Sequence, residues 1–272
     1  MSLITSRANA QVKAIRALRN KRERDRSGLL FAGGPRLVGE ALRQGAQIET
    51  VVVVPERLRV QTERDAIGAA RAQGAAVLEV SGDVYDSLAF RGEPESMGAV
   101  VRQRHDMLPE TPAGELSWVA VHEIQHPGNL GTLIRTSDAA GGAGVILTGT
   151  STDPYHPICV RGSLGAVFCQ RVVQTTQEEF AVWLKHYGAT VVGTSPAGGI
   201  DYREAVYRPP VVVLSGNERI GLSDDQLALC DQVVRIPMYG AVDSLNLSVA
   251  TALVLYEVRR ANPGDRPAIA AR

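Results

Sequence analysis

The chain has 272 residues, of which 44% are hydrophobic and 21% are charged. This composition excludes a disordered tail protein, a collagen-like fibre and a coiled coil. The 29 basic and 29 acidic side chains give a net charge of zero, which for the whole chain argues against a polyanion-binding protein. However, residues 1–26 hold eight basic and two acidic side chains (+6), so the remainder carries −6. One end of the protein is a basic module.

The cysteine pattern and the hydropathy indicate a cytoplasmic protein. Cys159, Cys169 and Cys230 are odd in number and form neither a CxxC motif nor a cluster with histidine, which argues against a disulfide scaffold and a zinc site. Residues 1–7 lack the apolar core of a signal peptide, and no apolar run is long enough to span a membrane. We expect a soluble intracellular protein without a metal.

The first part of the chain alternates helices and strands. A basic helix is expected over about 9–24, followed by an apolar stretch at 29–31. The further expectations are a helix at 35–44 that ends near Gly45, a strand at 48–54, a helix at 56–73 and a strand at 75–80. The alternation predicts a small α/β domain over 1–104. Residues 105–116, with two prolines, a glycine and mixed charges, read as a linker.

In the second part, over 117–272, the alternation is clearer. Strands are expected at 118–121, 144–147, 190–193, 211–214 and 233–236, and helices at about 130–141, 158–166, 177–187, 223–230 and 247–260. Unbroken Val/Ile/Leu strands between helices are typical of a parallel sheet covered on both faces. Such sheets bind ligands beyond the carboxyl ends of their strands, so the loops that follow the strands are the places to search.

The common phosphate-binding signatures, GxxxxGK[ST] and GxGxxG after a strand, are absent. Glycines 141, 142 and 144 follow a helix and precede a strand, which predicts a tight helix-to-strand turn. A Rossmann-type dinucleotide site is therefore not expected.

Three segments at strand ends carry polar side chains that have both an ordinary and a functional explanation. In segment 126–135, Asn129 can cap the helix from Leu130, and Gly131 and Arg135 share one helical face. In segment 214–222, glycines flank Glu218, which an ordinary exposed connection also explains. In segment 236–246, either Ser244 or Asn246 can cap the following helix, and the long loop is suited to folding over a ligand.

Taken in order, these segments resemble the motifs of the SpoU (TrmH-type) RNA ribose 2′-O-methyltransferases of the SPOUT superfamily. The matching elements are Asn129-x-Gly131-x-x-x-Arg135, Leu214-x-Gly216-x-Glu218-x-x-Gly221-Leu222 and Ile236-Pro-Met-x-Gly-x-x-x-Ser244-Leu-Asn246. Residues 1–104 resemble, more loosely, the L30e-like substrate-binding domain of relatives that modify ribosomal RNA. The chain departs from the family at Gly33, where relatives commonly have glutamate, and at His126, where many have an acidic residue.

The resemblance implies an α/β fold with a deep trefoil knot in the C-terminal parallel sheet, bound S-adenosylmethionine and a homodimer whose two chains build each active site. It places Asn129, Arg135, Glu218, Ser244 and Asn246 in the catalytic pocket. It also implies cofactor contacts from Thr194, Leu214, Ser215, Gly216, Asn217, Ile236, Met238, Ser244 and Leu245.

The basic N-terminal helix is expected to supply affinity for RNA phosphates. Together with Arg135, the predicted RNA-binding residues are Lys13, Arg16, Arg19, Lys21, Arg22, Arg24 and Arg26. The expected activity is methylation of a ribose 2′-hydroxyl in 23S ribosomal RNA, as a housekeeping or an antibiotic-resistance modification. A tRNA ribose methyltransferase and a non-catalytic RNA-binding knotted protein are the alternatives. The sequence leaves open which group removes the 2′-hydroxyl proton.

Overall fold

The computed structural model describes residues 3–89, 94–112 and 114–264. The chain folds into two compact units. The first consists of Met1–His105 together with Asp153–Cys169, and the second of Asp106–Thr152 together with Gln170–Arg272. Segment 153–169 therefore packs with the first unit, although in the sequence it lies inside the second. Across the described residues, no helix is both long enough and apolar enough to cross a membrane.

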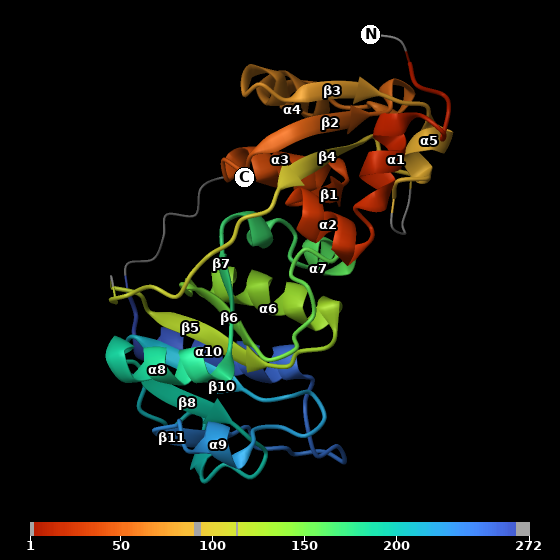
Figure 1. Ribbon diagram of the computed structural model, residues 1–272. Helices are drawn as coiled ribbons and strands as arrows, with labels where there is room; N and C mark the ends of the chain where they lie inside the picture. The colour runs from red at the N-terminus through yellow and green to blue at the C-terminus, as the bar shows by residue number, and fades with distance from the viewer. Residues whose placement is uncertain (1–2, 90–93, 113, 265–272) are drawn as a thin grey trace. The chain divides into compact units, whose positions relative to one another are not determined.

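The first unit is built on a four-stranded sheet in the order β1-β4-β2-β3 (Figure 1). Its strands are β1 (Leu29–Gly33), β2 (Ile48–Val53), β3 (Ala76–Glu79) and β4 (Met97–Arg102). Strand β4 pairs antiparallel with both β1 and β2, whereas β2 and β3 are parallel. The helices are α1 (Ala10–Ala17), α2 (Lys21–Ser27), α3 (Pro35–Arg43), α4 (Gln61–Ala72), α5 (Gly82–Asp86) and α7 (Pro157–Gly162), with 3-10 turns η1 (Pro55–Arg57) and η2 (Ala166–Phe168).

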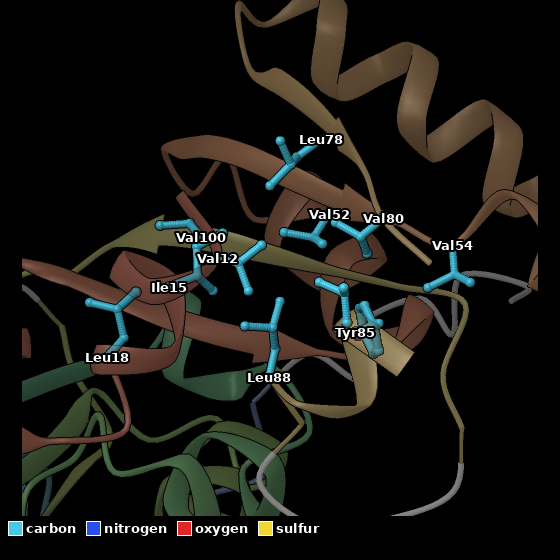
Figure 2. Packing of buried hydrophobic residues seen from close by; sticks show 11 residues of the cluster. Val12, Ile15, Leu18, Val52, Val54, Leu78, Val80, Tyr85, Leu88 and Val100 are labelled. Carbon is cyan, nitrogen blue, oxygen red and sulfur yellow. The ribbon is translucent and has the colours of Figure 1, made fainter. Parts of the chain in front are cut away.

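The core of this unit forms where α1 and α5 cover the sheet. Figure 2 shows Val12 and Ile15 of α1, and Leu18 directly after it, meeting valines of β2 and β4, with Tyr85 and Leu88 beside them. The Tyr85 hydroxyl donates to the carbonyl of Met97, which satisfies its one polar group inside the core. This part of the chain therefore combines helices and strands around one core, which is the α/β class that the sequence predicts.

Two helices of the first unit differ from the prediction: one is interrupted, and the other begins later. The basic helix expected over 9–24 is two helices, because the chain turns at Leu18–Asn20 and the Asn20 side chain caps α2 by accepting the Arg22 N–H at 3.0 Å. The helix expected from 56 begins only at Gln61, after the 3-10 turn η1. Strand β4 was not predicted.

The second unit contains a seven-stranded sheet in the order β7-β6-β5-β10-β8-β11-β9. The strands are β5 (Ser117–His122), β6 (Gly144–Thr148), β7 (Arg171–Thr175), β8 (Thr190–Thr194), β9 (Ile200–Asp201), β10 (Val211–Ser215) and β11 (Gln232–Arg235). Every pairing in this sheet is parallel, as predicted. The short β9 and the edge strand β7 were not predicted.

Helices cover both faces of this sheet. They are α6 (Pro127–Ala139), α8 (Gln177–Tyr187), α9 (Asp224–Leu227) and α10 (Leu247–Ala261). Alternate residues of β10 point to opposite faces: Leu214 joins the core under α8, and Ser215 contacts Thr251 of α10 at 2.9 Å. Helix α10 also packs against α6.

The strand order decides which loops meet. Strands β5, β10, β8 and β11 are consecutive neighbours and parallel, so the loops that follow them leave from the same edge of the sheet. These loops include the three segments singled out in the sequence. The fold therefore brings together motifs that are more than 100 residues apart.

Candidate active site

The loop that follows β10 is a tight, closed turn. The backbone N–H of Asn217 donates to the carbonyl of Gly221 at 3.0 Å, and the N–H of Gly221 returns to the carbonyl of Asn217 at 2.9 Å. A Cβ on Gly216 would lie 2.0 Å from the Gly221 oxygen, so this position requires glycine. Gly221 itself has φ +72°, a conformation that favours glycine. The turn presents Glu218 at its tip.

A hydrogen-bonded network joins Glu218 to the other two segments. The Glu218 carboxylate accepts the side-chain amide of Asn129 and, at 3.2 Å, the backbone N–H of Gln125. The Asn129 carbonyl oxygen Oδ1 in turn accepts the amide of Asn246 at 3.0 Å. Ser248 completes the arrangement by donating its hydroxyl to the backbone carbonyl of Asn129, also at 3.0 Å. Asn129 thus bridges Glu218 and Asn246.

The prediction that Asn129 caps a helix is wrong. Helix α6 begins at Pro127, a favourable first helical residue, and His126 occupies the cap position without a side-chain hydrogen bond. Asn129 lies inside the first turn, so its amide is available to the network. Asn246, by contrast, does cap α10 by accepting the N–H of Ser248 at 2.9 Å, while its amide reaches Asn129.

Two predicted site residues lie outside this network. Ser244 is exposed and donates its hydroxyl to Asp243 at 3.1 Å. Arg135 is exposed on α6, and among the described residues its guanidinium has no hydrogen bond or ion pair. Gly131, four residues earlier, is buried.

A cavity of about 470 Å³ lies beside the network, and Glu218 is one of its walls. Of the predicted cofactor residues, Thr194, Gly216, Asn217, Ile236, Met238, Ser244 and Leu245 line it. Leu214 and Ser215 are fully buried behind it, where Ser215 joins Thr194 and Thr251 through hydroxyl contacts at 3.1 and 2.9 Å.

Several residues of the site were missed from the sequence. Gln125 and Ser248 contact the network, and the cavity is also lined by Ser195, Pro196, Arg219, Ile220, Gly221, Leu222, Val234, Asp243, Leu247 and Ala250. A sequence signal existed for some of them. Leu247 and Ala250 share one face of a predicted helix, and the loops singled out in the sequence contain Arg219, Ile220, Gly221, Leu222 and Asp243. The other residues are set by long-range packing.

The predicted RNA-binding residues of the first unit have different surroundings. Arg24 is 1% exposed, so its guanidinium is structural, bonded to Asp153 and to the carbonyls of Leu18 and Arg19. Four more of these residues also have partners within the protein. Arg16 bonds the Ser87 hydroxyl and Arg19 the carbonyls of Ser87 and Ala89, while Lys21 pairs with Asp25 and Arg26 with Glu23. Lys13 and Arg22 are exposed, and among the described residues their side chains have no hydrogen bond or ion pair.

Comparison with known proteins identifies the family. Residues 117–256 match the model of the SpoU rRNA Methylase family, and residues 9–99 match an MRM3-like substrate binding domain. The chain belongs to the SpoU rRNA methylase family. It is an RNA methyltransferase.

Three similar proteins place the chain within the SpoU family. It is 32% identical, over 97% of its length and 94% of the relative, to the 23S rRNA (uridine(2479)-2′-O)-methyltransferase of Streptomyces viridochromogenes. It is 29% identical, over 95% of its length and 100% of the relative, to the 23S rRNA (guanosine(2553)-2′-O)-methyltransferase RlmP of Bacillus subtilis. The crystal structure of an AdoMet-bound rRNA methyltransferase from Sinorhizobium meliloti superposes with a TM-score of 0.87 at 38% identity, covering 97% of this chain and 99% of the other.

The cavity of this SpoU family member fits S-adenosylmethionine, the ligand of that neighbour. Leu222, Ile236, Met238 and Leu245 give it apolar walls suited to an adenine ring, and Glu218 adds a carboxylate. Glu218 also places a negative charge that complements a sulfonium. Among the residues that the structure describes, no group of His, Cys, Asp and Glu side chains could hold a metal ion.

Proposed function

We propose that this chain is an S-adenosylmethionine-dependent methyltransferase that methylates a ribose 2′-hydroxyl in 23S ribosomal RNA. The observation that carries the proposal is the position of Glu218, which lines the cavity and is hydrogen bonded to Asn129, the residue that binds Asn246. The cofactor and the reacting groups are thereby served by one connected set of residues. The two 23S rRNA methyltransferases reported above match nearly the whole chain.

In this proposal, the polar network orients the Glu218 carboxylate, and Arg135 stabilises negative charge on the RNA. When bound, S-adenosylmethionine supplies an electrophilic methyl group on a sulfonium. Asn129, itself held by the amide of Asn246, helps to keep the Glu218 carboxylate in one orientation beside the cavity. This orientation supplies the alignment that an in-line displacement requires. A guanidinium has a pKa above about 12 and is a poor base. Arg135 therefore grips the phosphate beside the target ribose and stabilises the developing alkoxide.

We also propose that the protein is a homodimer. Val249, Leu253 and Tyr256 of α10 are 47%, 38% and 52% exposed and recur at helical spacing, so they form one apolar stripe. Tyr239 in the preceding loop is 87% exposed. An apolar stripe beside an exposed aromatic is typical of an interface. A second copy would also provide a partner site for Arg135, whose guanidinium has no hydrogen bond or ion pair within the described part of its own chain.

The finer description of the fold is part of the same proposal. We infer an L30e-like RNA-binding domain over 1–104, a linker over 105–116 and a knotted methyltransferase domain over 117–272, from which segment 153–169 packs with the first unit. Two features of the topology support a threaded C-terminal sheet. Strand β10 lies between β5 and β8, and after β11, which is next to the edge of the sheet, the chain returns so that α10 packs on β10 and β5. Lys13 and Arg22 are the best-placed contacts to RNA phosphate in the first unit. A ribosomal RNA substrate also supports a cytoplasmic location of the protein.

The test is methyl transfer with defined RNAs. The purified protein is incubated with methyl-labelled S-adenosylmethionine and either 23S rRNA, 16S rRNA or total tRNA, and the modified ribose is located by reverse transcription. We expect label in 23S rRNA at one 2′-hydroxyl, and a much slower but measurable labelling with Glu218→Gln. Label confined to tRNA, or label absent from every RNA with cofactor binding intact, would overturn the proposal.

A further inference from the structure

Gln125, in the loop that follows β5, contacts the Glu218 carboxylate, and it lies outside the three motif elements quoted from the sequence. Its backbone N–H donates to Oε2 of Glu218 at 3.2 Å. Asn129 bonds the other oxygen, Oε1. The two oxygens of Glu218 are therefore held by two different donors, and the carboxylate plane is fixed only when both donors are in place.

The direction of the Gln125 N–H depends on an unusual turn at Glu123. Glu123 has φ +49°, in the left-handed region that residues with a side chain rarely adopt. Its N–H is bonded to the carbonyl of Thr148 at 3.0 Å. Gly149, opposite, has no room for a Cβ, which would lie 2.8 Å from the Glu123 side chain. Such a conformation persists where the surroundings enforce it, and it often marks a functional site.

The Gln125 side chain holds this turn closed. Its Nε2 donates to the carbonyl of Glu123 at 3.0 Å and to the carbonyl of Thr150 at 2.9 Å, so both of its hydrogens are used on the backbone. The Glu123 carbonyl also accepts the amide of Asn217 at 3.3 Å. Since Asn217 precedes Glu218, the β5 loop and the Glu218 loop are joined on both sides of the carboxylate.

We propose that Gln125 is a positioning residue for methyl transfer: its side chain locks the turn at Glu123 so that its own N–H orients Glu218. The inference rests on the proposed function, since it assigns a task to Glu218 in that reaction. Gln125 is exposed and does not line the cavity, so it acts through Glu218 and not through the cofactor.

The kinetic test compares Gln125→Ala and Gln125→Glu with the wild type, and Gln174→Ala, an exposed glutamine of β7, serves as the control. We expect about a tenfold loss of kcat in Gln125→Ala, with cofactor affinity by calorimetry changed less than twofold and Tm unchanged. Gln125→Glu should lose more, because a carboxylate would face two carbonyl oxygens. In a Glu218→Gln background, Gln125→Ala should cost less than twofold.

Several outcomes contradict the inference. Wild-type kcat in Gln125→Ala, the same tenfold loss in the Glu218→Gln background, or a loss explained by weaker cofactor binding or a lower Tm would each overturn it. A wild type that transfers no methyl group to RNA would instead overturn the proposed function. In that case an NMR readout still decides: because the Gln125 N–H donates to Glu218, its amide resonance should move in Glu218→Gln and stay in place in Gln174→Ala, and an amide resonance that Glu218→Gln leaves unmoved would refute the contact.

Discussion

The buried ion pair between Arg24 and Asp153 is the interaction whose removal should destabilise the first unit most. The Arg24 side chain is 2% exposed and that of Asp153 is 10% exposed. Arg24 donates to Oδ2 of Asp153 from Nε at 3.0 Å and from Nη2 at 2.5 Å. The change Asp153→Asn keeps the shape of the side chain but places a neutral amide against the guanidinium.

The expected loss follows from what remains around the charge. Removing one partner of a buried ion pair typically costs about 3–5 kcal/mol, since the other charge is left uncompensated. Arg24 keeps its two bonds from Nη1 to the carbonyls of Leu18 and Arg19, both at 2.8 Å. An amide oxygen at residue 153 can still accept the N–H of Tyr155. We therefore expect Asp153→Asn to lower the free energy of unfolding by about 3 kcal/mol, the lower end of that range. For a unit of this size the loss lowers Tm by roughly 10 °C.

Calorimetric or circular-dichroism melting of the full chain measures this loss, with Lys21→Met, which breaks an exposed pair with Asp25, as the control. The control should change the free energy of unfolding by less than about 1 kcal/mol. A double variant, Arg24→Met with Asp153→Leu, should recover part of the loss. If Asp153→Asn melts like the wild type while Arg24→Met only weakens RNA binding, Arg24 is a surface RNA contact and the reasoning is refuted.

Three further predictions concern the second unit. Arg135→Ala should lower methyl transfer more than 100-fold with cofactor affinity by calorimetry within twofold of wild type; near-normal turnover would exclude its proposed role. Gly216→Ala should weaken cofactor binding at least tenfold, because the added Cβ has no room, whereas Gly199→Ala, where the Cβ meets open space, should bind normally. Hydrogen bonds from the Arg203 side chain lower the pKa of Asp201 to about 2; the stabilisation is present above about pH 4 and lost as pH falls through 2. An NMR titration should show this midpoint, and Arg203→Ala should return it toward 3.8.

Elements with local start and stop signals were predictable from the sequence. Helix α8 matches its predicted range, 177–187, because Thr176 and Glu179 form a capping box and Gly188 ends the helix in the left-handed conformation. Strand β4 was missed because Gly98 and Ala99 interrupt its apolar run, and its burial comes from pairing on both sides with β1 and β2. Local pattern does not reveal that kind of burial.

The candidate site was predictable as a set of loops but not as a set of contacts. Parallel strands order the loops after β5, β8, β10 and β11 along one edge, which the alternation of strands and helices already indicates. Which donors meet Glu218 depends on the register between β5 and β10 and on the turn at Glu123. Pro127 did carry a usable signal, since proline favours the first helical position and so places Asn129 inside the helix.

The assignment of segment 153–169 to the first unit makes that unit discontinuous in the gene. The chain leaves it after residue 105, returns at 153 and leaves again after 169. If the chain is cut at the linker, the C-terminal fragment carries Val160 and Phe168 without the partners that bury them. The N-terminal fragment lacks Asp153, the partner of Arg24. Exchange of the first unit between relatives, by recombination or by engineering, must therefore move two separate stretches of coding sequence together, and chimaeras with a single crossover should fold poorly.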